Sequence, residues 1–164
     1  MPNDDLVVSD TPPLLNLALI DRFDLLETQF SSITVPTHVW TELTEGDAGV
    51  DALVALRDKG FLSIVEVEES ELFTEIGHEL DRGETAAICH AIERDADLVL
   101  IDEKDGRRVA RRHGLTVTGV IGILLRGANN GNVALQTELD ALRDAGFWIS
   151  DRLYSKVLRK ANTN

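Results

Sequence analysis

The sequence alternates between short apolar runs rich in β-branched residues and longer segments with helical periodicity. Strands that are covered by helices on both faces are buried on both sides, so they read as continuous apolar runs rather than as alternating ones. The alternation therefore predicts an α/β fold with a central parallel sheet between two layers of helices. Strands are expected at residues 6–10, 33–35, 61–67, 98–101, 115–118 and 147–149.

Helical patterns occupy the segments between these runs. A first helix is expected over 14–26, with Thr11 as its N-cap and prolines in its first turn, where a missing N–H does no harm. The other helices are expected after Pro36 up to Gly46 and over 51–59, 70–80, 84–94, 106–113, 121–129, 136–145 and 151–161.

At 164 residues the chain is sized for one domain with its own core. We expect a single domain over 1–164, with an α/β core at 1–133 and a C-terminal helix-strand-helix extension at 134–164. Acidic residues occupy the start, where a secretory signal would carry Lys or Arg, and the longest charge-free apolar run, 114–125, is too short to cross a bilayer. The expected location is the cytoplasm, with no membrane partner.

The charge is distributed unevenly along the chain. The formal net charge of −13 would usually argue against a nucleic-acid partner. Residues 1–103, however, hold 5 basic and 24 acidic residues, whereas residues 104–164 hold 11 basic and 5 acidic ones. An anionic partner would therefore meet the second half of the chain.

Two strand runs resemble each other and both end in aspartate: DLVVSD ends at Asp10 and DLVLID ends at Asp102. In a parallel sheet both side chains would emerge at the carboxyl edge, where open α/β folds bind ligands. Asp also suits turns and helix caps, which is the alternative explanation for each residue alone.

Two glutamates extend this acidic set. Glu84 lies four and seven residues before Ile88 and Ala91, which places it at the head of an apolar helix stripe, although a first-turn Glu also favours the helix dipole. Glu42 is flanked by apolar residues on a helix that follows a strand. The alternative is that it is an ordinary solvated acid on the helix surface.

Four carboxylates about 6 Å apart would repel by roughly 3 kcal/mol per pair at an effective dielectric of about 20. A divalent cation with oxygen preference, Mg²⁺ or Mn²⁺, would neutralise them.

The motifs VVSDTPPL, VWTEL, RGETAAICHA and LVLIDEKDGRRVARRHGLTVTG, with the ending GFWISDRLYSKVL, resemble those of an uncharacterised prokaryotic subfamily of PIN domains, which are metal-dependent ribonucleases. The resemblance implies a three-layer α/β/α domain and makes Asp10, Glu42, Glu84 and Asp102 the acidic quartet that holds Mg²⁺ or Mn²⁺. In this family the fourth acidic position can have a companion a few residues on, so the resemblance implies that Asp105 can replace or assist Asp102. The sequence departs from the family pattern at Glu84, where Asp is common, and at Pro12, where Ser is usual.

A basic stretch follows Asp102 directly: Lys104, Arg107, Arg108, Arg111 and Arg112. At helical spacing the four arginines form two rows beside the proposed metal edge, which suits contacts to RNA phosphates. The alternative is that these basic residues lie on a solvated face and only balance the negative charge of neighbouring acids. The four histidines, His38, His78, His90 and His113, and the single Cys89 show no spacing typical of zinc ligands and are interpreted as structural or surface residues.

Taken together, the residues and the resemblance predict a metal-dependent endoribonuclease that hydrolyses RNA phosphodiester bonds. The resemblance further implies the toxin of a toxin–antitoxin pair, with a small antitoxin as partner, and a homodimer is a further expectation. The alternative is a non-catalytic PIN-like module for nucleic-acid binding or assembly. Two other acidic α/β classes do not fit the sequence. Haloacid-dehalogenase-like phosphatases need an Asp where Pro12 stands, and phospho-accepting receiver domains need a paired acid after the first strand, which Ser9-Asp10-Thr11 does not provide.

Overall fold

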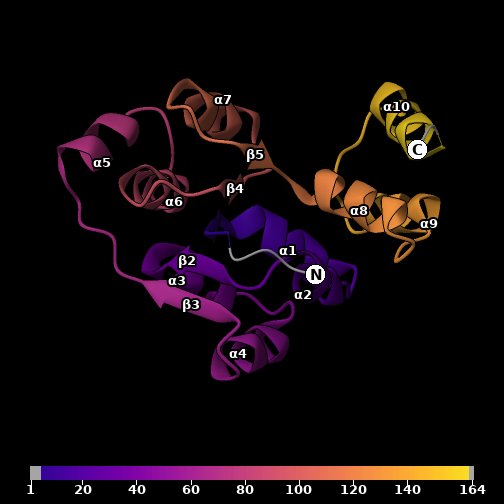
Figure 1. Ribbon diagram of the computed structural model, residues 1–164, viewed down its shortest axis with the longest axis horizontal. Coiled ribbons are helices and arrows are strands. Elements are labelled where there is room, and N and C mark those ends of the chain that lie inside the picture. The colour runs from indigo at the N-terminus through magenta and orange to yellow at the C-terminus, as the bar shows by residue number, and fades with distance from the viewer. Residues whose placement is uncertain (1–4, 163–164) are drawn as a thin grey trace.

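A computed structural model describes residues 5–162, and at its centre lies a five-stranded, fully parallel sheet (Figure 1). The strand order is β3-β2-β1-β4-β5, so the first strand lies in the middle of the sheet. The strands are β1 (Val7–Ser9), β2 (Ile33–Pro36), β3 (Leu62–Val65), β4 (Leu98–Leu100) and β5 (Val117–Thr118). The predicted α/β class with a parallel sheet is confirmed.

Helices cover both faces of this sheet. In Figure 1, α5, α6 and α7 lie on one side, whereas α1, α2 and α8 to α10 lie on the other. The helices are α1 (Thr11–Leu19), α2 (Asp24–Gln29), α3 (Thr37–Glu45), α4 (Val50–Asp58), α5 (Glu71–Ile76), α6 (Arg82–Glu93), α7 (Lys104–Arg112), α8 (Val120–Asn129), α9 (Leu135–Asp144) and α10 (Asp151–Asn162).

Adjacent residues of the central strands enter different cores, which explains their continuous apolar character. Val7 packs into the cluster formed with α1 to α4 and α8 to α10, whereas Val8 packs into the cluster formed with α5 to α7. On β4, Val99 and Leu100 divide between the two clusters in the same way. Because side chains alternate along a strand, a strand covered on both faces exposes no side chain to solvent, so most of its residues are apolar.

The helix predicted over 14–26 is two helices, α1 and α2. The chain breaks at Asp21, which adopts a φ of 56°, a left-handed conformation that Asp tolerates better than most residues. The N-cap position of α1 is occupied by Asp10 rather than by Thr11, because the helix begins at Thr11 itself.

The strand predicted at 147–149 was also wrong. Within the described residues these three positions pair with no strand and belong to the connection between α9 and α10. Ile149 packs into the core, but Trp148 is 82% exposed, so the apolar run is not buried on both sides. The extension over 134–164 is therefore helix–loop–helix in its described part.

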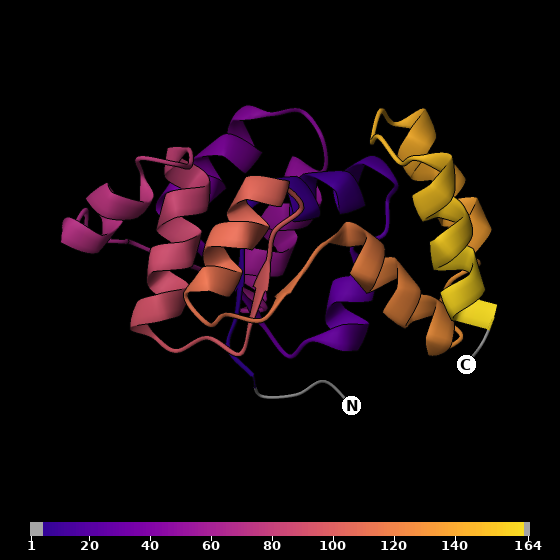
Figure 2. The same ribbon diagram turned by 90° about the horizontal axis from the view of Figure 1, so that it is seen from above.

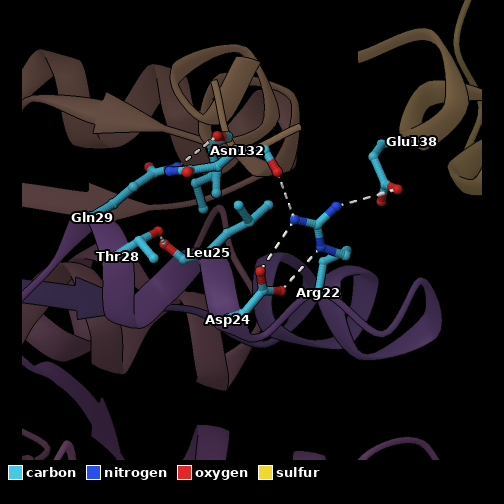
Figure 3. Close-up of polar contacts among 8 residues, drawn as sticks. Arg22, Asp24, Leu25, Thr28, Gln29, Asn132 and Glu138 are labelled. Carbon is cyan, nitrogen blue, oxygen red and sulfur yellow. Dashed lines mark hydrogen bonds and ion pairs between the residues drawn. The ribbon is translucent and has the colours of Figure 1, made fainter. Parts of the chain in front are cut away.

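The C-terminal helices pack beside α8 at one end of the molecule (Figure 2). Figure 3 shows how Arg22 ties them to the α1–α2 connection. Its guanidinium donates to the Asp24 carboxylate at 3.0 and 3.1 Å and to the backbone oxygen of Asn132 at 3.0 Å, and it lies 3.4 Å from the Glu138 carboxylate. Gln29 adds a bond from its side-chain amide to the carbonyl of Ile123 at 2.9 Å.

Across residues 5–162, no helix has the length and apolar character needed to span a membrane. Residues 1–4, which include part of the acidic start of the sequence, lie outside the described residues.

Candidate active site at the carboxyl edge of the sheet

Asp10 stands at the point where β1 ends and α1 begins. Its backbone N–H donates to the carbonyl of Leu100 at 3.0 Å, which continues the ladder to β4 and fixes the residue at the carboxyl edge. The side chain is only 2% exposed, and its Oδ2 has no hydrogen-bond partner among the described residues. Burial, together with the charges of Glu84, Asp81 and Glu42, raises the pKa of Asp10 to about 8 despite the backbone N–H of Thr11.

Glu84 approaches Asp10 from the first turn of α6. Asp81 caps this helix by accepting a hydrogen bond from the backbone N–H of Glu84 at 2.8 Å. Glu84 is 4% exposed, as its place on the apolar stripe predicted, and its Oε2 has no partner in the described part of the chain. Burial and the neighbouring Asp81 and Glu103 raise its pKa to about 7.

Glu42 reaches the same place from α3. A Cβ added to Gly83 would lie 2.6 Å from Glu42 Oε1 and 3.5 Å from Asp10 Oδ1, so both carboxylates occupy the space that a side chain at position 83 would need. Glycine at this position therefore lets the backbone of α6 approach two carboxylates closely. Asp10 and Glu42 are thus brought together at Gly83. The carboxylate of Glu84 lies against Gly106 of α7, and its charge acts on Asp10.

Asp102 follows β4 and has different neighbours. Its Oδ1 accepts from the backbone N–H of Val120 at 2.8 Å, and its Oδ2 accepts from the side-chain amide of Asn16 at 3.0 Å. Burial raises the pKa of Asp102, and these two donors and the guanidinium of Arg107 partly offset the rise.

The sheet register offsets Asp102 from Asp10 by one residue along the strands. The matching runs DLVVSD and DLVLID suggest that Asp10 and Asp102 are equivalent, but Ser9 pairs with Leu100, so Asp102 lies one residue farther along its strand than Asp10 does. Asp102 is held at the same edge of the sheet by Asn16 and the backbone N–H of Val120.

Asp105 does not face this group. Its side chain is 71% exposed and lies 3.7 Å from Arg108, one turn along α7. Within the described structure, no contact joins it to the other predicted acids.

The predicted phosphate-binding residues divide into three kinds. Arg107 is half-buried and donates to the carbonyl of Ile101 at 3.3 Å, next to Asp102. Arg108 and Arg112 both bind Glu79, at 3.5 and 2.6 Å. Lys104 and Arg111 are exposed.

Sequence reasoning missed two residues that organise the site, Asp81 and Asn16. Asp81 and Glu84 have the spacing of a capping box, Asp-x-x-Glu, which the sequence could have revealed. Asn16, which holds Asp102, is the lone polar residue within the run LLNLAL, and that isolation was its signal.

The donor chemistry of the site fits a hard divalent cation, because every candidate ligand is a carboxylate oxygen. The buried Oδ2 of Asp10 and Oε2 of Glu84 are without partners in the described residues and are free to bind one. Among residues 5–162, however, no group of three or more His, Cys, Asp or Glu side chains has a geometry that would hold a metal ion as it stands.

A parallel α/β sheet with buried carboxylates converging at its carboxyl edge defines a class of proteins that bind ligands at that edge. The family model of the PIN domain matches residues 6–163, nearly the whole chain, and the chain therefore belongs to the PIN domain family. PIN domains are in general nucleases and typically use divalent metal ions, so the family supports a hydrolase acting on nucleic acid. A search of curated proteins gives no significant match.

Proposed function

We propose that this protein is a metal-dependent endoribonuclease that hydrolyses RNA phosphodiester bonds. One observation carries the proposal: buried oxygens of Asp10 and Glu84, which have no hydrogen-bond partner in the described structure, share the edge of the sheet with Glu42. Burying a carboxyl group without partners is costly, and a protein does so only where another group compensates. RNA as substrate rests on the resemblance of the motifs to PIN-domain ribonucleases.

Asp10, Glu42 and Glu84 would hold Mg²⁺ or Mn²⁺, with Asp102 beside them. When bound, such a cation activates water and stabilises the departing oxygen of a phosphodiester. Asn16 and the backbone N–H of Val120 fix both oxygens of Asp102, which limits its rotation. Arg107, anchored on the carbonyl of Ile101, places a positive charge next to Asp102, where a phosphate of the substrate would lie.

The proposal predicts that Asp10→Asn and Glu84→Gln each lower the rate of metal-dependent RNA cleavage by at least about 100-fold. Each change removes the charge and keeps the volume, and a loss of about 2.7 kcal/mol of transition-state stabilisation corresponds to that factor. Cleavage of single-stranded RNA in Mg²⁺ or Mn²⁺ measures the effect, and circular dichroism checks the fold. Asp144→Asn is the matched control, because Asp144 is an exposed acid at the end of α9.

Full activity in both site variants would overturn the assignment of the site. Absence of cleavage in the wild type, together with retained RNA binding, would instead favour a non-catalytic binding or assembly module.

We further propose that the protein acts in the cytoplasm as the toxin of a toxin–antitoxin pair, a role that rests on the resemblance alone. Its expression should then arrest growth, Asp10→Asn should relieve the arrest, and a small protein encoded by a neighbouring reading frame should suppress it. Sedimentation of the purified chain tests the expected homodimer.

A further inference from the structure

A pocket of about 280 Å³ opens beside the carboxylates, between α3 and the first turn of α6. Thr37, His38, Thr41, Glu42 and Arg82 line it. Glu42 belongs both to this pocket and to the acidic group around Gly83. A molecule in the pocket would therefore lie next to the proposed reaction centre.

His38 offers one free hydrogen-bonding group to this pocket. Its ring packs against Phe73, with 5.8 Å between ring centroids, and its Nδ1 is buried without a partner among the described residues. With Nδ1 enclosed by the protein, Nε2 is the ring nitrogen left to bond to a ligand.

The two threonines of the pocket differ in availability. The hydroxyl of Thr37 donates to the carbonyl of Val65 at 3.1 Å and is therefore committed. Thr41 lies exposed on α3, and no hydrogen bond of its hydroxyl is found within the described structure. His38 and Thr41, one turn apart on the helix, thus present two uncommitted polar groups.

Arg82 supplies the positive charge of the pocket. It is the first residue of α6, its side chain is 67% exposed, and its guanidinium pairs with Glu69 and lies 5.7 Å from the ring centre of Phe73. An exposed ion pair of this kind contributes little, so an RNA phosphate can replace Glu69 at small cost.

The pocket and the basic helix α7 lie on opposite sides of Asp10. Helix α3 follows β2 and helix α7 follows β4, and β1, which carries Asp10, lies between these two strands. An RNA strand that contacts Arg107 on one side of the carboxylates would reach Arg82 and His38 on the other.

We propose that this pocket is a nucleotide subsite, which binds the nucleotide next to the scissile phosphate. Arg82 pairs with its phosphate, while His38 Nε2 and the hydroxyl of Thr41 bond to its base or ribose. The volume lies near the lower end of the range for small-molecule sites, which suits one nucleotide rather than several. This inference rests on the proposed function, because it names where the substrate of the same site is held.

Binding of ribonucleoside 5′-monophosphates, followed by NMR in the presence of a chelator, tests the subsite without cleavage or a bound metal. We expect shifts centred on residues 37–42 and 82. Thr41→Trp, which fills the pocket, and His38→Phe, which keeps the packing on Phe73 and removes both ring nitrogens, should each weaken binding at least tenfold. Thr137→Trp is the matched control, since Thr137 is an exposed threonine of α9, and it should bind as the wild type does.

A cleavage assay separates this inference from the proposed function. Raised KM for RNA in Thr41→Trp and His38→Phe, with the control unchanged, supports the subsite. RNA cleavage with unchanged KM in both variants, or nucleotide shifts that lie elsewhere on the protein, would overturn the subsite and leave the ribonuclease proposal intact. Nucleotide binding at the pocket in a protein that cleaves no RNA would support the subsite and contradict the ribonuclease proposal.

Discussion

Asp10 combines deep burial with the lack of a partner for one of its oxygens in the described structure. The negative charges of Glu84, Asp81 and Glu42 add to the effect of burial and raise its pKa further. Near pH 7 and without a cation, the group therefore binds a proton in the native state. A divalent ion and a proton would compete for the same carboxylate.

At the residue scale, we predict that the metal-free protein loses stability as the pH rises from about 5 to 8. The pKa of Asp10 is about 8 in the native state, above its ordinary value of about 3.9 in the unfolded chain, so the native state binds more protons between these values. The free energy of unfolding then falls by up to about 1.4 kcal/mol per pH unit from this group and falls no further above its native pKa. Glu84, with a pKa of about 7, changes in the same direction.

Urea unfolding at a series of pH values in chelator, for the wild type and Asp10→Asn, measures this difference. The Asn variant cannot ionise, so its stability should depend less on pH and should exceed that of the wild type near pH 8. Parallel profiles for the two proteins would contradict the buried carboxyl group described for Asp10.

Helix α7 places its basic residues in two rows with different electrostatic surroundings. Arg108 and Arg112 share the carboxylate of Glu79, and these arginines lower the pKa of Glu79. Lys104 and Arg111 are exposed, and no ion pair engages them within the described residues. A phosphate would have to displace Glu79 from the first pair but would meet no such competitor at the second.

At the element scale, we predict that replacing Lys104 and Arg111 together by Gln flattens the salt dependence of RNA binding more than replacing Arg108 and Arg112 does. Each phosphate contact to single-stranded RNA contributes roughly −0.7 to the log–log slope, so loss of two contacts changes the slope by about 1.4. Because phosphate contacts position the strand without reading bases, all RNA sequences should weaken alike.

Fluorescence titrations of several RNA sequences over a range of salt concentrations, at a fixed metal concentration, make this comparison. Unchanged slopes in both double variants would mean that these residues do not contact RNA phosphates and only balance the charge of neighbouring acids. A larger change in Arg108→Gln/Arg112→Gln would mean that Glu79 yields readily to phosphate.

At the scale of the whole molecule, the site depends on segments far apart in the chain. Asp10 follows β1, Glu42 lies on α3, Glu84 begins α6, and Asp102 is held by Asn16 from α1 and by the start of α8. A ligand that binds these carboxylates therefore recognises the folded chain and not its unfolded form, which makes binding a contribution to stability.

We predict that Mn²⁺ raises the melting temperature of the protein. An ion present at 100 times its Kd adds about 2.7 kcal/mol, which corresponds to roughly 5–10 °C for a domain of this size. Differential scanning calorimetry with Mn²⁺ and with chelator measures the shift, and Asp10→Asn should reduce it while Asp144→Asn should not. An equal melting temperature with and without the ion would count against a metal centre.

The α/β class, the parallel sheet and most of its elements could be predicted from the sequence alone. These follow from local periodicity and from the continuous apolar strands, both of which depend on residues close together in the chain. It failed where tertiary contacts decide: the break at Asp21 and the exposed Trp148 after α9 depend on what packs against each segment.

The candidate site shows the same division. Residue types and strand ends sufficed to nominate Asp10, Glu42, Glu84 and Asp102, because parallel strands deliver their carboxyl ends to one edge. The tertiary structure was needed to show that Asp10 and Glu42 meet at Gly83. It also showed that Asp102 is offset by the β1–β4 register and held by Asn16. Register and helix approach are set by the packing of both cores, which involves residues distant in the chain, so no local pattern could specify them.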